Sequence, residues 1–286
     1  MSTCGVETTL EAPPERIVTI KSSATEMVLA LGAGDRLVGT AFADGPLPGG
    51  LAEVEPPVLA EQNPASESVL ELEPDLVYAG WESNLSADGA GERAMYEDLG
   101  ISTYVSPSAC KAPDQQPEKL TFDLVMDEIT QMGAVLGRTD AAAELVAAQR
   151  AELAAVEPAG DGRTALWYSS GTETPYVGAG IGAPQMIMEA AGLANIADDV
   201  ADTWTSLAWE AVAEEDPDVI VLVDAAWNTA EHKIDTLEAN PVTATLTAVR
   251  EGRYVTVPFP ASEAGVRSVP AAADLADQLA ELGRTD

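Results

Sequence analysis

The sequence predicts an α/β protein built from two Rossmann-like lobes that are joined by a long, rigid helix. Three observations predict this fold class. Short β-branched runs alternate with helical segments in both halves of the 286-residue chain, two long helical segments lie between the halves, and a segment of the first half has a counterpart in the second. A chain of this length also favours two medium-sized lobes over one core.

Strand-helix-strand units predict the first lobe. Residues 17–20 form a β-branched run, and the following Ser23 and Glu26 make a capping-box pattern before an apolar helix that ends at Gly32. We expect Ser23 to accept a hydrogen bond from the Glu26 backbone amide. Such alternation indicates a parallel sheet. Further strands are expected at residues 37–40, 76–79 and 101–105, with a helix at residues 91–99.

Two helical segments, at residues 121–136 and 140–156, follow the first lobe. They contain no flexible Gly/Ser linker, so we expect a stiff connection that permits small rocking movements. The second lobe is predicted from strands at residues 164–168 and 254–257 and a helix at residues 183–191.

The two halves also share one segment. Glu73-Pro74-Asp75, an apolar run and Trp81 have a counterpart in Asp216-Pro217-Asp218, an apolar run and Trp227. We therefore expect an N-terminal lobe at residues 1–120, a helical connection at residues 121–160 and a C-terminal lobe at residues 161–286. The cleft between two such lobes is the natural place for a ligand.

The charge of the chain excludes one class of partner. Its 48 acidic and 14 basic side chains give a formal net charge of −34 at pH 7, which repels phosphate backbones, so we expect no nucleic-acid partner. No stretch of the sequence is long and apolar enough for a membrane-spanning helix, and residues 1–4 lack the basic and apolar regions of a signal peptide.

The sequence contains no recognisable catalytic or metal-binding motif. Its one histidine, His232, lies in a charged helical segment where we expect it to be solvated, whereas general-base hydrolases and zinc sites normally use more imidazoles. There is no P-loop, nucleophile elbow or C-x-x-C spacing. We therefore expect no catalytic residue, no metal and no cofactor. The alternative of an enzyme on a two-lobed α/β frame has no named catalytic set.

Several segments resemble a known family of proteins. Residues 14–20, 23–26 and 29–39 are similar to the opening of the substrate-binding proteins that serve ABC importers of cobalamin, haem and ferric siderophores, and residues 72–77 and 216–220 resemble later signatures. The resemblance covers roughly residues 12–282 and implies capture of a small molecule outside the cytoplasm, at the cell surface or in the periplasm. The expected partners are an ABC permease and its ATPase, and the chain is expected to be a monomer.

Other segments resemble an actinobacterial subgroup of that family, which is described as importing a deazaflavin coenzyme precursor. These are residues 4–7, 167–171, 174–177, 204–207 and 224–229. The implied ligand is a small, anionic, conjugated molecule such as the phosphorylated precursor. Cobalamin, a ferric siderophore and haem stay open as alternatives, although haem normally needs axial His, Tyr, Met or Cys ligands.

Ligands of open parallel sheets lie beyond the carboxyl ends of the strands. Lys21 follows a predicted strand and Arg267 is similar to an arginine at the same place in members of the family, so both are expected to hold an anionic group. The resemblance to a cobalamin-binding member also implies that Trp81 and Trp204 stack on a flat ring system. The simpler alternatives are a solvated Lys21 beside a helix cap, tryptophans in the lobe cores and an Arg267 paired with local carboxylates. The complete set of expected ligand-binding residues is Lys21, Ser22, Ser23, Gln62, Trp81, Tyr168, Ser169, Ser170, Thr172, Trp204, Trp227, Phe259 and Arg267.

The resemblance also implies roles for two glutamates and two cysteines. Glu92 and Glu210 match the family's exposed docking glutamates, which contact arginines of the permease, although exposed glutamates are common in so acidic a chain. Because an extracytoplasmic compartment is oxidising, we expect Cys4 and Cys110 to form a disulfide. The alternative is that Cys4 carries a lipid, but Ser2-Thr3 does not resemble a lipobox, so we expect the anchor of a lipidated precursor to lie upstream.

Overall fold

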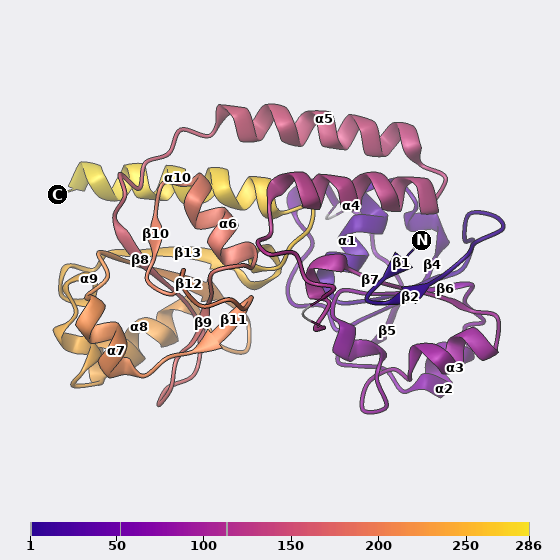
Figure 1. Cartoon of the computed structure of the whole chain (residues 1–286), viewed down its shortest axis with the longest axis horizontal. Helices are drawn as coiled ribbons and strands as arrows, with labels where there is room; N and C mark the ends of the chain where they lie inside the picture. The colour runs from indigo at the N-terminus through magenta and orange to yellow at the C-terminus, as the bar shows by residue number, and fades with distance from the viewer. Residues whose placement is uncertain (1, 52, 113, 286) are drawn as a thin grey trace. The chain divides into compact units, whose positions relative to one another are not determined.

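The chain divides into two units that each contain a mainly parallel β-sheet (Figure 1). The computed structural model describes residues 2–51, 53–112 and 114–285. We call residues 1–117 and 123–148 the first lobe, and residues 118–122 and 149–286 the second lobe. Helix α5 (Thr139–Ala155) contributes residues to both. Among the described residues, none of the helices combines the length and hydrophobicity that crossing a membrane requires.

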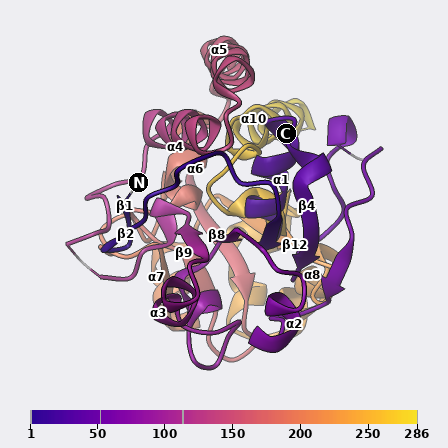
Figure 2. The same cartoon turned by 90° about the vertical axis from the view of Figure 1, so that its right-hand side faces the viewer.

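The first lobe has five parallel strands in the order β5-β4-β3-β6-β7. Every residue of the central strand β3 is buried, because helices cover both faces of the sheet (Figures 1 and 2). Val18 and Ile20 pack with Val69 and Tyr96 on one face, whereas the Tyr78 hydroxyl donates to Glu128 of α4 on the other. The elements are β3 (Ile17–Ile20), α1 (Ser22–Ala30), β4 (Leu37–Ala41), β5 (Val58–Ala60), α2 (Ser66–Leu70), β6 (Leu76–Ala79), α3 (Arg93–Asp98), β7 (Ser102–Val105) and α4 (Phe122–Val135).

Helix α1 does not begin with the predicted capping box. It starts at Ser22, two residues earlier than the capping box predicts, and its N-cap residue Lys21 has a left-handed φ of 84° and makes no side-chain cap. The prediction that Ser23 caps the amide of Glu26 is therefore wrong. The Ser22 amide instead donates to an Asp44 carboxylate oxygen at 3.4 Å, so a residue beyond the next strand supplies the cap.

The second lobe has its main sheet in the order β11-β9-β8-β12-β13, and β10 pairs with β8. Strands β8, β10, β12 and β13 are parallel, whereas β9 and β11 run antiparallel to their neighbours. One face of the sheet packs on α7, α8 and α9, and α10 packs on α6 and β13. The elements are β8 (Thr164–Ser170), β9 (Tyr176–Gly178), α6 (Ala183–Ala190), β10 (Ala194–Asn195), β11 (Trp204–Ser206), α7 (Trp209–Glu215), β12 (Val219–Asp224), α8 (Ala230–Ala239), α9 (Thr247–Glu251), β13 (Tyr254–Pro258) and α10 (Ser268–Thr285).

The two Pro-Asp segments have the same local structure in the two lobes. Glu73 and Asp216 both adopt a left-handed conformation, with φ of 46° and 40°. The Asp75 carboxylate accepts from the backbone amide just before β3 at 3.0 Å, and the Asp218 carboxylate accepts from the Thr164 amide that begins β8 at 2.8 Å. Each aspartate thus joins the start of one central strand to the start of its neighbour, which explains why the sequence repeats.

The predicted disulfide is confirmed. Cys4 and Cys110 are bonded, with their Cα atoms 5.1 Å apart, so neither is a free thiol. The bridge ties the N-terminal arm, with β1 (Ser2–Thr3) and β2 (Val6–Glu7), to the segment after β7. Arg93 of α3 also donates to the Thr3 carbonyl at 2.6 Å. The arm is therefore an attached part of the first lobe.

Short 3-10 helical turns complete the chain. They lie at Gly34–Arg36, Gly49–Leu51, Glu82–Leu85, Pro107–Ala109, Thr243–Thr245 and Phe259–Ser262.

Candidate functional site

A buried ion pair lies beyond the carboxyl ends of the first lobe's strands. Lys21 follows β3, and its ammonium pairs with Asp44, which follows β4; their side chains are 1% and 4% exposed. The ammonium lies 3.5 Å from the centre of the Trp81 ring and 4.0 Å from that of Phe42. The interpretation of Lys21 as a solvated lysine is therefore wrong. Two aromatic rings and one carboxylate enclose its charge.

Asp44 neutralises Lys21 and also completes the start of α1. Its backbone amide donates to the Ser22 hydroxyl at 2.8 Å, while its carboxylate accepts from the Ser22 amide. Burial raises the pKa of the Asp44 carboxyl, and the nearby Lys21 ammonium partly opposes that rise. Because this carboxylate compensates the ammonium, Lys21 does not present an unbalanced positive charge at this edge.

The other first-lobe candidates differ in their exposure. Ser22 and Ser23 are buried, Gln62 is exposed and Trp81 is half-buried, with its ring edge-on to Phe42 at 5.8 Å. A pocket of about 290 Å³ adjoins the edge and includes Ser22 in its lining. Most of the remaining lining is aliphatic: it comes from the ends of β4 and β5 and from residues 43–47 and 55–56. This surface suits apolar parts of a ligand more than charged ones.

In the second lobe, strand β8 is longer than predicted. It continues to Ser170, whereas the predicted strand ended at Tyr168, so Tyr168 and Ser169 both lie in the strand and are buried. The Tyr168 hydroxyl donates to the Gly171 carbonyl at 2.9 Å, and burial raises its pKa to about 12. Ser170 is half-buried and Thr172 is exposed, so these two hydroxyl residues are the more accessible ones.

Three aromatic residues of the second lobe are accessible to different degrees. Trp204 on β11 is half-buried and stacks on Tyr176 of β9, with ring centres 5.7 Å apart and an angle of 14° between the planes. Trp227, which follows β12, is 61% exposed and meets the buried Phe259 edge to face at 5.8 Å. Trp227 is the most exposed tryptophan of the predicted set.

Arg267 directly precedes α10 and is half-buried. The carbonyl of its neighbour Val266 accepts from the buried Gln149 amide at 2.8 Å, which fixes the backbone at this point. Sequence reasoning missed two further charged residues at the strand ends, Asp44 and Lys233. Asp44 lies shortly after the strand predicted at residues 37–40, which gave a usable signal, whereas Lys233 lies inside the helix that follows β12.

Comparison with known proteins identifies the family. Residues 17–261 match the family model of the periplasmic binding protein. The chain belongs to this family. It is 30% identical over 233 residues to a cobalamin-binding protein of Halobacterium salinarum, an alignment that covers 74% of this chain and 55% of the relative. The chain thus spans about half the length of that relative.

Solved members of similar fold agree with the assignment. A periplasmic binding protein from Veillonella parvula superposes with a TM-score of 0.84 at 25% identity, over 95% of this chain and 93% of that one. The structure of an ABC-type Fe³⁺-hydroxamate transport system from Saccharomonospora viridis gives 0.82 at 28% identity, over 97% of both chains. The predicted two-lobed α/β fold and family are confirmed.

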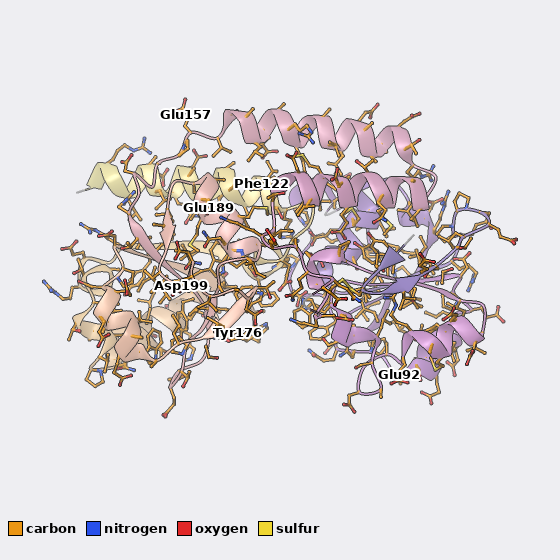
Figure 3. The ribbon with its side chains drawn as sticks, in the orientation of Figure 1. Glu92, Phe122, Glu157, Tyr176, Glu189 and Asp199 are labelled. Atoms are coloured by element: carbon orange, nitrogen blue, oxygen red, sulfur yellow. A yellow bond between two sulfur atoms is a disulfide. The ribbon has the colours of Figure 1, made fainter. Side chains whose placement is uncertain are left out.

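The two glutamates expected to dock on a permease are both exposed. Glu92 is the N-cap residue of α3 in the first lobe (Figure 3), and Glu210 lies in the first turn of α7 in the second. An acidic side chain is favoured at such helix starts. Among the described residues, no three His, Cys, Asp or Glu side chains are grouped as a metal site would require.

Proposed function

We propose that this chain is the extracytoplasmic substrate-binding protein of an ABC importer. It binds a small molecule and delivers it, chemically unchanged, to a permease and its ATPase. Family membership over residues 17–261 supports this function, and so does the similarity to the Saccharomonospora viridis protein, which belongs to a transport system. The observation that carries the proposal is the exposed Trp227, an aromatic side chain beyond the carboxyl end of a parallel strand.

We propose a flat, conjugated ligand with an acidic group, such as a phosphorylated deazaflavin precursor. Trp227 and the half-buried Trp204 supply aromatic surface, and the exposed hydroxyl of Thr172 supplies a polar contact. We assign the acidic group to Arg267, which is half-buried just before α10, and not to Lys21, which lies in a buried ion pair with Asp44. Its planar guanidinium can bind a phosphate or carboxylate through two parallel hydrogen bonds.

The relatives favour a second candidate within the same family, a cobalamin or a ferric hydroxamate. Such a cargo brings its own chelating groups, so it needs no metal ligands from the protein. Haem is a weaker candidate. Of the three tyrosines considered as axial ligands, Tyr78 and Tyr168 are buried at 0% and 2% exposure, and Tyr176 alone is accessible, at 42%.

Calorimetric titration tests the ligand class. The purified protein is titrated with the phosphorylated precursor, its dephosphorylated form, cyanocobalamin, a ferric hydroxamate and hemin, and mass spectrometry checks that the bound compound is unchanged. We expect the phosphorylated compound to bind most tightly and Arg267→Ala to weaken it selectively. Arg284→Ala is the control, because Arg284 is 71% exposed on α10, the helix that Arg267 precedes. Tighter binding of cyanocobalamin or the hydroxamate would show that this compound, and not the phosphorylated precursor, is the ligand. Chemical conversion of any compound by the protein would contradict the transport function.

The full-length precursor is proposed to be lipid-anchored and to work as a monomer. The anchor does not use Cys4 in this structure, because Cys4 is bonded to Cys110. Mass spectrometry of the protein extracted from its native membrane tests this, since the lipid mass must map to a different cysteine.

A further inference from the structure

Lys233, on helix α8, is a buried lysine that bonds to backbone carbonyls. Its side chain is 1% exposed, and its ammonium donates to the backbone carbonyls of Val223 and Asn228, both at 2.6 Å. Within the described ranges, no carboxylate forms an ion pair with this ammonium. Burial lowers the pKa of Lys233 to about 8, and Asp224 only partly offsets this.

The position of Lys233 in the helix makes its positive charge still less favourable. It is the fourth residue of α8, which begins at Ala230, so it lies near the positive end of the helix dipole. Desolvation and the dipole both oppose a cation there. An apolar side chain at position 233 would stabilise both the buried site and the helix more than a lysine does. The stability of the fold therefore does not explain the lysine.

The two carbonyls bound by Lys233 lie on either side of one turn. Val223 is the penultimate residue of β12, and Asn228 ends the turn that follows. Ala225 and Asn228 also exchange backbone hydrogen bonds across this turn, at 3.0 and 3.3 Å. The Asp224 carboxylate accepts from the first amide of α8 at 2.8 Å. Lys233 therefore closes a turn that is fixed at both ends.

Trp227 lies within this fixed turn. It is the most exposed large hydrophobic side chain at this edge, yet its ring contacts Phe259 and lies 5.9 Å from the Lys233 ammonium. A large aromatic ring that is both exposed and held in place is typical of a binding contact.

We propose that Lys233 is a positioning residue that holds the Trp227 turn in its binding conformation, so that Trp227 is preformed for stacking on a flat, conjugated ligand. The inference rests on the proposed function. Its physical basis is preorganisation: a side chain that is already ordered loses less conformational entropy when the ligand binds.

The test combines a measurement of motion with one of affinity. The variants are Lys233→Met, which keeps the length but removes the donors, Lys233→Arg, which keeps charge and donors, Trp227→Ala, and the double variant Lys233→Met with Trp227→Ala. Lys119→Met is the matched control, because Lys119 is 43% exposed. The probe is riboflavin 5′-phosphate, a flat and conjugated phosphate. Time-resolved fluorescence anisotropy measures the motion of the Trp227 ring. The signal of Trp227 is the difference between each protein and the same protein with Trp227→Phe.

We expect Lys233→Met to increase the fast motion of Trp227 and to weaken binding of the probe about tenfold, as a loss of about 1.4 kcal/mol would. Trp227→Ala should weaken binding by a similar factor, and the double variant should be no weaker than Trp227→Ala alone. Lys233→Arg should retain most of the affinity, and Lys119→Met should change nothing.

Unchanged anisotropy of Trp227 in Lys233→Met would overturn the proposal, and so would losses that simply add in the double variant. If Lys233→Met does not fold, the anisotropy and affinity of Lys233→Arg decide: a mobile Trp227 despite the retained charge and donors overturns the proposal, and a held one supports it. If the unmodified protein binds no flat conjugated probe, the proposed ligand class fails, whereas the anisotropy comparison still decides whether Lys233 holds Trp227.

Discussion

Each lobe places a buried lysine and a tryptophan beyond the carboxyl end of its sheet, but the two lysines are compensated in different ways. Lys21 has a buried carboxylate partner and lies 3.5 Å from the Trp81 ring centre. Lys233 has two backbone carbonyls and lies 5.9 Å from the Trp227 ring centre. In the first lobe the lysine thus occupies a tryptophan face, whereas in the second it leaves the tryptophan exposed. A lysine and a tryptophan therefore stabilise the edge of the first sheet, whereas at the edge of the second sheet the tryptophan stays accessible to a ligand.

The two sheets also differ in the direction of one strand. The first lobe's β4 is parallel to β3, so the chain leaves β4 at the carboxyl edge and brings Asp44 there. At the same sheet position the second lobe has β9, which is antiparallel to β8, and the chain enters it directly through a short turn. The loop that holds Asp44 therefore has no counterpart after β9 in the described part of the second lobe, and Lys233, which lies beyond β12 on the other side of β8, bonds to backbone carbonyls.

The largest expected effect is on the ion pair of the first lobe. Asp44→Asn removes the carboxylate that pairs with the buried Lys21 ammonium, which should lower the free energy of unfolding of that lobe by about 3–5 kcal/mol. Urea unfolding with lobe-resolved hydrogen exchange measures it. The double variant Lys21→Met with Asp44→Leu removes both charges and should recover most of the loss. A loss below about 1 kcal/mol for Asp44→Asn would show that water screens the pair, and that the two lysines do not differ in this way.

The two lobes should also respond to pH in opposite directions. Burial raises the pKa of Glu128 in the first lobe from 4.5 to about 7, partly opposed by hydrogen bonds from Ser106 and Tyr78. Because the folded state favours the protonated carboxyl, its contribution is complete below pH 4.5 and is lost as pH rises to 7. The expected loss is about 3 kcal/mol. Unfolding of Glu128→Gln across this range should lack most of that decline, and an equal decline in both proteins would contradict the assignment.

For Lys233 the sign is reversed. Its pKa falls from 10.5 to about 8 on folding, so the unfolded chain binds the proton more tightly and stability should rise between pH 8 and 10.5. Both proteins, the parent and Lys233→Met, contain the same tyrosines, which titrate in the same pH range. The difference between their unfolding free energies therefore isolates the contribution of Lys233. A parent that gains no stability relative to Lys233→Met over this range would show that the ammonium is better solvated than its burial indicates.

Most of the fold could be predicted from the sequence, because local patterns determine it. The β-branched run at Ile17–Ile20 and the Pro-Asp segments mark strand starts with little dependence on distant residues. The expectation of an oxidising compartment correctly predicted the disulfide between Cys4 and Cys110. The site was harder, because its contacts are distant in sequence. The sequence around Lys21 gives no sign that Asp44, which lies beyond the next strand, pairs with it. The sequence therefore suggested that the positive charge of Lys21 binds a ligand.

A smaller effect should separate the two tryptophans. If Trp227 is the preformed contact, Trp227→Ala should weaken binding of riboflavin 5′-phosphate about tenfold, within the range of about 1–3 kcal/mol for an aromatic stacking contact. Trp81→Ala should weaken it less, because Lys21 already occupies a face of that ring. Fluorescence titration measures both. Equal losses would show that the two edges contribute alike, and a larger loss for Trp81→Ala would reverse the comparison.

The smallest effect on the isolated protein is expected from the two exposed glutamates, Glu92 and Glu210. Each starts a helix on its own lobe, and exposed ion pairs contribute only about 0–1 kcal/mol, so Glu92→Lys and Glu210→Lys should leave folding and ligand affinity unchanged. If they dock on permease arginines, charge reversal should still slow uptake in reconstituted vesicles, and both changes together should slow it more than either alone. Glu67→Lys, another exposed acidic residue of the first lobe, is the control. Weaker ligand binding in either variant would place that glutamate in the ligand site. Unaltered uptake in the double variant would show that neither glutamate contacts the permease.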